Sequence, residues 1–179
     1  MTPYERTQLS RNRTAGAFPF PELRPCIDYA ITEFAGELRD ALLRYERTGD
    51  VRNNDRAHSQ RAELGDAFYM LLSACIKADH KPKLHNAEAL PPRQQCNAIV
   101  RLLTHAADAA DDIEQFGPAE DTLEILHDAL DNAYTRMVAL CVGWYDWRPA
   151  DVVEEACQKF ERKHASGRYN PEVHGGHNI

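Results

Sequence analysis

The chain has 179 residues and a mass of 20.3 kDa, enough for one well-buried core, and 43% of its residues are hydrophobic, too many for a disordered protein. Its formal net charge of −7 argues against a nucleic-acid-binding protein, because neutralising phosphates requires a basic surface. It has no apolar run of membrane-spanning length and no start typical of a signal peptide, and its five cysteines are scattered without metal-site spacing. We therefore expect a soluble, cytoplasmic protein with reduced thiols, which interacts with neither membranes nor nucleic acid.

The first 25 residues are polar, contain three prolines after Ala17 and show little periodicity. We expect residues 1–25 to form an arm that lies on the core, with Arg11 and Arg13 within reach of a ligand. A loosely ordered terminus is the alternative interpretation.

Apolar residues recur every three or four positions from Cys26 to Thr48, and again from about Asp55 to Ala78. This spacing predicts two helices, the first capped by Gly49 and the second by Asp55. Because the connection between them is short, we expect an antiparallel hairpin over residues 26–78.

After a proline-containing connector, helices are expected at about 94–116 and 119–147, on either side of a Gly-Pro break. A last helix at about 150–164 follows Pro149 and leads into a basic tail, residues 165–179. The predicted fold is therefore all-α: a four-helix-bundle core of two helical hairpins plus a C-terminal helix, together residues 26–164, and the tail.

Acidic residues interrupt the first hairpin at helical spacing. On the first helix Glu37 lies about 40° and Asp40 about 20° from Glu33, and Glu63 and Asp66 lie on one side of the second. Carboxylates gathered at the edge of an apolar stripe repel one another unless a cation joins them. Oxygen ligands without Cys or His favour Mg²⁺ or Mn²⁺ over zinc. The competing interpretation is a solvated acidic face.

The second hairpin repeats this spacing, with Asp108 and Asp112 four apart and Asp128 and Asp131 three apart. Acidic residues are common on helix surfaces, so two interpretations stay open. Either the second hairpin is a diverged repeat of the first, or the recurrence of the acidic spacing is a coincidence.

The neighbours of these acids carry a family resemblance. The order Glu33, Glu37, then Glu63-x-x-Asp66 about 25 residues later resembles the EExxE…ExxD signature of the MazG-like all-α nucleoside triphosphate pyrophosphatases. The stretches Ala35-Gly36-Glu37-Leu38 and Glu63-Leu64-Gly65-Asp66-Ala67-Phe68-Tyr69, with the later Lys159-Phe160-Glu161-Arg162-Lys163, resemble motifs of the same family. The resemblance covers residues 26–78 and, more weakly, the tail. It implies Mg²⁺-dependent hydrolysis of a nucleoside triphosphate to the monophosphate and pyrophosphate, with two or three Mg²⁺ or Mn²⁺ ions per site.

The resemblance also implies roles for individual residues. Glu33, Glu37, Glu63 and Asp66 would be the catalytic and metal-binding carboxylates, and Asp40 is a further candidate ligand. The basic groups expected to bind substrate phosphates are Lys159, Arg162, Lys163, Arg61 and Arg56. The resemblance further implies that the protein assembles into a homodimer or homotetramer. By analogy with compact viral members of the family, the implied substrate is a dNTP of the dGTP or dUTP type, and the protein would then act in the host cytoplasm.

Two positions depart from the family pattern. Phe34 stands where a second glutamate is usual, so either Glu33 or Asp40 must complete the metal site. Ala156 stands where the tail motif usually has Asn.

Three other functions compete with this one. A non-enzymatic helical oligomerisation module would carry the same acids on a solvated face. A di-iron bundle would use Glu124-x-x-His127 and Glu161-x-x-His164, which have the required spacing. A phosphoribosyl-ATP pyrophosphohydrolase belongs to the same superfamily.

Overall fold

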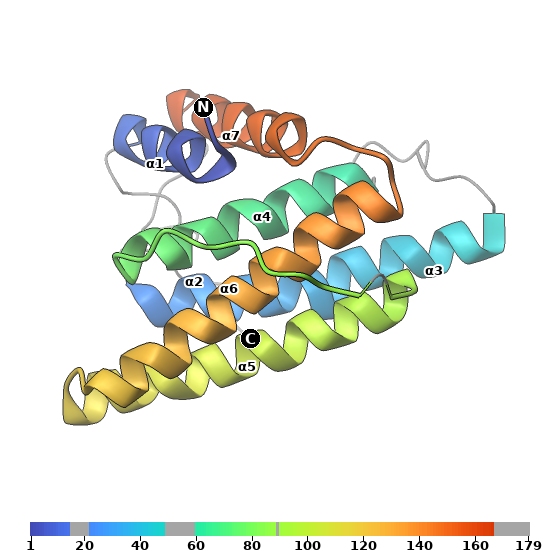
Figure 1. Cartoon of the computed structure of the whole chain (residues 1–179). Helices are drawn as coiled ribbons and strands as arrows, with labels where there is room; N and C mark the ends of the chain where they lie inside the picture. The colour runs from blue at the N-terminus through green and yellow to red at the C-terminus, as the bar shows by residue number, and fades with distance from the viewer. Residues whose placement is uncertain (15–21, 49–59, 89, 167–179) are drawn as a thin grey trace.

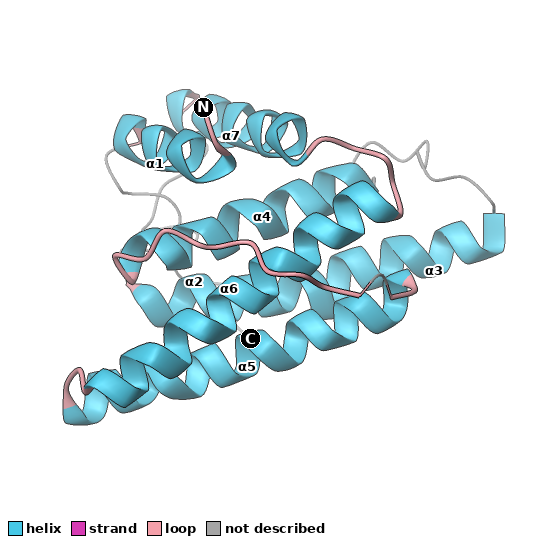
Figure 2. Ribbon diagram, viewed as in Figure 1, coloured by secondary structure: helices cyan, strands magenta, loops and turns pink. Residues whose placement is uncertain are grey.

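The computed structural model describes residues 1–14, 22–48, 60–88 and 90–166, and all the regular structure in these ranges is helical (Figures 1 and 2). The prediction of an all-α chain is therefore confirmed. The elements in chain order are α1 (Pro3–Arg13), α2 (Leu23–Thr32), η1 (Glu33–Glu37), α3 (Leu38–Thr48), α4 (Gln60–Lys77), α5 (Pro92–Phe116), α6 (Glu120–Gly143) and α7 (Pro149–Ala165).

The expected arm over residues 1–25 begins with a helix that the sequence did not predict, α1, which packs against α4 and α7. Thr2 and Glu5 form a capping box, with Glu5 N–H donating to the Thr2 hydroxyl and Thr2 N–H donating to the Glu5 carboxylate. Pro3 occupies the first turn, where no backbone donor is needed. The four buried residues of α1, Arg6, Thr7, Ser10 and Arg11, are all polar.

The first predicted helix is longer and less regular than expected. It begins at Leu23, because Pro25 fits the donor-free first turn, and continues through α2, η1 and α3 to Thr48. Its middle section, η1, is π-helical: the Leu38 N–H donates to the Glu33 carbonyl five residues earlier. The predicted caps Gly49 and Asp55 lie outside the described residues.

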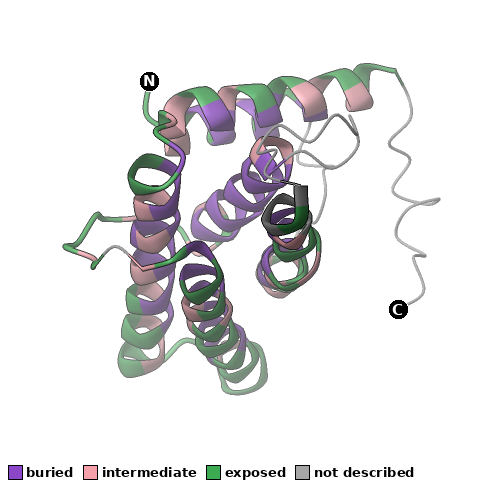
Figure 3. Cartoon of the chain, turned by 90° about the vertical axis from the view of Figure 1, so that its right-hand side faces the viewer, coloured by how far each residue is buried: buried purple, intermediate pink, exposed green. Residues whose placement is uncertain are grey.

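The helix α4 is the centre of the molecule and contacts every other helical element except α5. It runs antiparallel to the α2–η1–α3 helix on one side, while α1 and α7 lie over its opposite side (Figure 1). The helices α5 and α6 form a second antiparallel hairpin that packs against α2, η1 and α4. Figure 3 shows the buried residues on the faces that the helices turn towards one another.

Every residue from Glu63 to Cys75 is buried, so α4 has no solvated face along this stretch. Such a helix must be enclosed by other elements, and its polar residues are enclosed with it. The acids of α4 are therefore held inside the protein.

An ionic network fastens α7 to α1. The Arg6 side chain is 9% exposed; its guanidinium donates to both oxygens of Glu154, at 2.5 and 3.2 Å, and to Glu161 at 2.7 Å. Glu161 also contacts Arg13 at 3.3 Å. A planar guanidinium suits this shared recognition of two carboxylates.

Replacing Arg6 with Ala is expected to lower the free energy of unfolding by about 2 kcal/mol, because two partly exposed carboxylates lose a buried partner. Urea denaturation measures this loss. The matched control is Arg13→Ala, whose 56% exposed side chain should contribute less than about 1 kcal/mol. Equal losses for the two variants would contradict this assignment.

No helix within the described part of the chain is both long and apolar enough to cross a lipid bilayer.

Candidate metal centre

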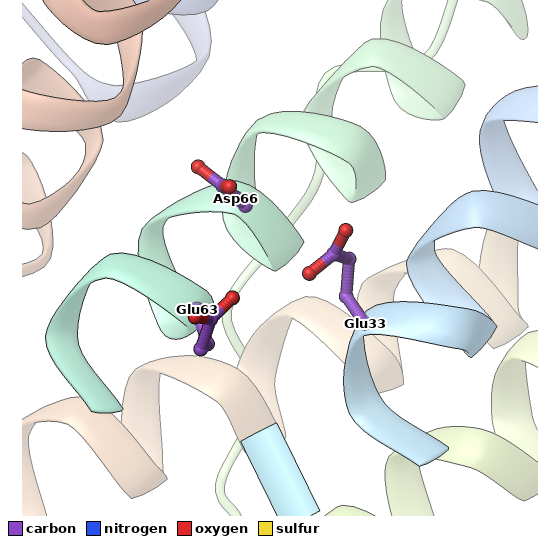
Figure 4. A group of neighbouring side chains, drawn as sticks. All are labelled: Glu33, Glu63 and Asp66. Atoms are coloured by element: carbon purple, nitrogen blue, oxygen red, sulfur yellow. The ribbon is translucent and has the colours of Figure 1, made fainter. Parts of the chain in front are cut away.

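The candidate metal centre lies where η1 crosses α4. Glu33 is the first residue of η1, and Glu63 and Asp66 lie about one turn apart on α4 (Figure 4). One carboxylate oxygen from each of the three residues lies within 4.8 Å of the other two. Figure 4 shows Glu33 reaching from its helix towards the two acids of α4.

These three acids are buried rather than solvated. Glu33 is 4% exposed, Glu63 2% and Asp66 8%. The interpretation as a solvated acidic face therefore does not describe Glu33, Glu63 or Asp66.

Burial makes negative charge costly in this cluster. Desolvation, followed by the charges of Asp66 and Glu37, raises the pKa of Glu33 to about 8. Desolvation, followed by a hydrogen bond with Glu37, raises the pKa of Glu63 to about 8. Desolvation also raises the pKa of Asp66, although Lys159 acts in the opposite direction. The protein holds three carboxyl groups where their ionised forms are disfavoured unless positive charge is supplied.

Two oxygens of the cluster identify where such a charge fits. Glu33 Oε2 and Asp66 Oδ1 are buried and accept no hydrogen bond from the described residues. A buried carboxylate oxygen without a donor is expensive, and a divalent cation satisfies several such oxygens at once. The donor set is all oxygen, which suits Mg²⁺ or Mn²⁺.

The cluster opens into a pocket of about 220 Å³ between α2, η1, α4 and α7. Its lining combines the acids with two lysines and three large side chains: Tyr29, Glu33, Glu37, Glu63, Asp66, Met70, Lys159, Phe160 and Lys163. Lys159 and Lys163 lie one turn apart on α7, with ammonium nitrogens 5.6 and 5.7 Å from the centroid of the Phe160 ring. Lys159 also forms an ion pair with Asp66. The pocket can therefore receive a ligand that carries both a divalent cation and negative oxygens.

The close approach of α7 to α4 depends on Gly65. A Cβ atom at this position would lie 3.2 Å from the Val152 carbonyl oxygen and 3.3 Å from the Ala156 Cβ. Ala156 is itself 4% exposed, so the residue found where the resemblance expects Asn belongs to this tight contact. The Gly65–Ala156 contact brings Lys159 within reach of Asp66.

A second pocket, also of about 220 Å³, lies between α4 and α7 and shares Asp66 and Lys159 with the first. Arg61 and Arg162 line it. Arg61 donates to both oxygens of Glu155, at 2.9 and 2.8 Å, and its guanidinium lies 5.1 Å from the centroid of the Trp147 ring. Three predicted phosphate-binding residues thus meet beside Asp66.

The remaining predicted site residues are placed differently. Glu37 lines the first pocket but is exposed. Asp40 is exposed and lines neither pocket, so the structure brings Glu33 rather than Asp40 to the acids of α4. Arg56 lies outside the described residues.

The second hairpin does not reproduce the cluster. Among the described residues, only Glu33, Glu63 and Asp66 form a group of three or more metal-ligating side chains. Asp131 is buried but accepts hydrogen bonds from His80 Nε2 at 2.6 Å and Lys83 N–H at 2.8 Å. The other acids of the repeat, Asp108, Asp112 and Asp128, are exposed.

The two Glu-x-x-His motifs do not converge either. Glu161 is bound by Arg6 and Arg13, and Glu124 is exposed on α6. His127 stacks on His80, with ring centroids 4.2 Å apart. The structure therefore gives the di-iron alternative no site within the described residues.

Sequence reasoning missed Tyr29, Met70 and Phe160 as lining residues. Tyr29 lies four positions before Glu33 and Met70 four after Asp66, so their helical spacing could have indicated this shared face. The neighbouring aromatic residues Phe34 and Tyr69 are fully buried core residues.

Comparisons with protein-family models, curated proteins and solved structures found no match to this chain.

Proposed function

We propose that this protein is a Mg²⁺-dependent nucleoside triphosphate pyrophosphohydrolase, which converts a nucleoside triphosphate and water to the monophosphate and pyrophosphate. The observation that carries the proposal is the convergence of three buried carboxylates beside Lys159 and Lys163, two of them with oxygens that accept no hydrogen bond from the described residues. A phosphorylated ligand that binds through divalent cations is held by carboxylates, which bind the cations, and by positively charged side chains, which contact the phosphate oxygens.

Glu33, Glu63 and Asp66 would hold the metal ions, with Glu37 at the open side of the same pocket. The bound ions would neutralise phosphate oxygens and make water a better nucleophile. Lys163 in the first pocket, and Lys159 with Arg162 beside the second, would bind the phosphates and offset the charge that develops on the departing pyrophosphate.

The resemblance to the MazG-like pyrophosphatases supports the same conclusion, because Glu33, Glu63 and Asp66 are positions of the matching motifs. The resemblance also motivates three further parts of the proposal. They are a MazG-like four-helix core built from the α2–η1–α3/α4 and α5/α6 hairpins, a dNTP of the dGTP or dUTP type as substrate, and assembly into a homodimer or homotetramer.

A panel of all ribo- and deoxyribonucleoside triphosphates tests the activity, each incubated with Mg²⁺ or Mn²⁺ and its products separated by chromatography. We expect pyrophosphate and a monophosphate from at least one substrate, and none when the metal is chelated. Release of inorganic phosphate instead of pyrophosphate, or no turnover of any substrate, would contradict the proposal.

Mg²⁺ titrated without nucleotide separates this function from a non-enzymatic oligomerisation module. A cation that binds only the folded protein raises the unfolding temperature. An unfolding temperature that Mg²⁺ leaves unchanged, with Glu63→Gln behaving as the parent protein does, would favour the module.

A further inference from the structure

The ion pair between Lys159 and Asp66 joins the two pockets. Lys159 comes from α7 and Asp66 from α4, and both residues line the pocket of the acidic cluster and the pocket that contains Arg61 and Arg162. The Lys159 side chain is 33% exposed and that of Asp66 12%. A flexible, partly solvated ammonium group thus reaches into a nearly buried acidic site.

The pairing of Asp66 is one-sided. Lys159 contacts Oδ2, whereas Oδ1 is buried and accepts no hydrogen bond from the described residues. The facing Glu33 Oε2 is buried in the same way. The Lys159 ammonium group therefore neutralises Asp66 at Oδ2 only. It leaves Asp66 Oδ1 and Glu33 Oε2 as the oxygens that a divalent cation could bind.

We propose that Lys159 is the internal counter-cation of the metal-free site, and that a divalent cation displaces it from Asp66 into the neighbouring pocket, where it then meets substrate phosphate. This inference rests on the proposed function for the identity of that phosphate. The ammonium ion and the divalent cation compete for the same carboxylate, because Asp66 cannot offer its charge fully to both.

The second pocket supplies a destination for the displaced ammonium. Its lining includes Asp66 and Lys159 themselves, and also Glu155, whose exposed carboxylate already pairs with Arg61. A lysine side chain has a flexible four-carbon stem, so it can change direction without any movement of α7. The exchange transfers positive charge towards Arg61 and Arg162 when the metal arrives.

The exchange predicts opposite effects on binding and turnover. Lys159→Gln removes the competitor, so metal-free protein should bind Mg²⁺ at least about tenfold more tightly, equivalent to about 1.4 kcal/mol. The same variant loses a phosphate-binding group, so its turnover should fall. A lysine with a purely structural role would not tighten Mg²⁺ binding.

Isothermal titration of Mg²⁺ into nucleotide-free protein measures the first effect, and Lys163→Gln is the matched control. Lys163 lies one turn further along α7, at nearly the same distance from the Phe160 ring, and faces the same acids. We expect about a twofold gain for Lys163→Gln, from reduced charge repulsion alone. An equal gain for both variants would overturn the exchange and leave only a general charge effect.

The movement of Lys159 has its own readout in the parent protein. Labelling with an amine-reactive reagent, followed by mass spectrometry, should modify Lys159 faster when Mg²⁺ is present. Unchanged or slower labelling of Lys159 would overturn the displacement. Mg²⁺ binding without hydrolysis would contradict only the proposed function, whereas a failure of both the parent and Lys159→Gln to bind Mg²⁺ would contradict both proposals.

Discussion

Replacing Glu33 with Gln is expected to reduce hydrolysis at least about a thousandfold, which corresponds to about 4 kcal/mol of transition-state stabilisation. Gln keeps the size of the side chain but offers one neutral oxygen in place of a carboxylate. The metal-free variant should nevertheless be more stable than the parent protein, because it no longer buries an acid among acids. Turnover assays and thermal unfolding in a chelator measure the two effects.

Asp40→Asn is the matched control for this variant. Asp40 lies on the same continuous helix but is exposed and lines neither pocket, so we expect little change in either property. The pair also decides which residue completes the metal site in place of Phe34. Loss of activity in Asp40→Asn, with an active Glu33→Gln variant, would assign that role to Asp40.

The metal-free protein is expected to lose a few kcal/mol of stability as the pH rises from about 4.5 to about 8. Glu33 and Glu63 have a pKa of about 8 in the folded protein against 4.5 when exposed, so the folded state binds more protons across this interval. Their contribution is fully present below the pKa of the unfolded chain. It is lost as the pH rises through the pKa of the folded protein. Urea denaturation in a chelator over this pH range measures the loss.

Mg²⁺ should reverse this trend, because it binds the ionised carboxylates and competes with the same protons. The apparent Mg²⁺ affinity should therefore rise with pH, and calorimetry in buffers of different ionisation enthalpy should detect released protons. The Glu33→Gln variant should lose a substantial part of the pH dependence. A parent protein whose metal-free stability is flat over the interval would contradict the burial of ionisable acids at this site.

The helices of the core were predictable because their apolar residues repeat at helical spacing, and Gly117 marks the turn between α5 and α6. The helix α1 was not predicted, although Thr2 and Glu5 form a capping box that the sequence displays. Its buried face is polar, so the apolar repeat that identifies other helices is missing. Its partners on α7 lie almost the whole chain away, and no local pattern connects them.

The site was predictable to the extent that it depends on helical spacing. Helical spacing brings Glu63 and Asp66 together within α4. The π-helical turn between Glu33 and Glu37 changes their relative position from that of an uninterrupted helix, and spacing did not predict this turn. Spacing could not decide whether Glu33 or Asp40 joins the acids of α4, because that depends on which part of the α2–η1–α3 helix lies against α4. The contact of Lys159 with Asp66 depends on the Gly65–Ala156 approach, which only the packing of α7 reveals.

The π-helical turn η1 makes the acidic site sensitive to the length of the chain. A π turn is equivalent to one residue inserted into an α-helix, so the side chains before and after it are offset by about 100° relative to an unbroken helix. Deleting one residue between Glu33 and Glu37 would restore a regular helix and keep the apolar face of α3 on the core. The same deletion would rotate α2 and Glu33 away from Glu63 and Asp66. The geometry of the acidic site therefore depends on the inserted residue of η1 as well as on the acids themselves.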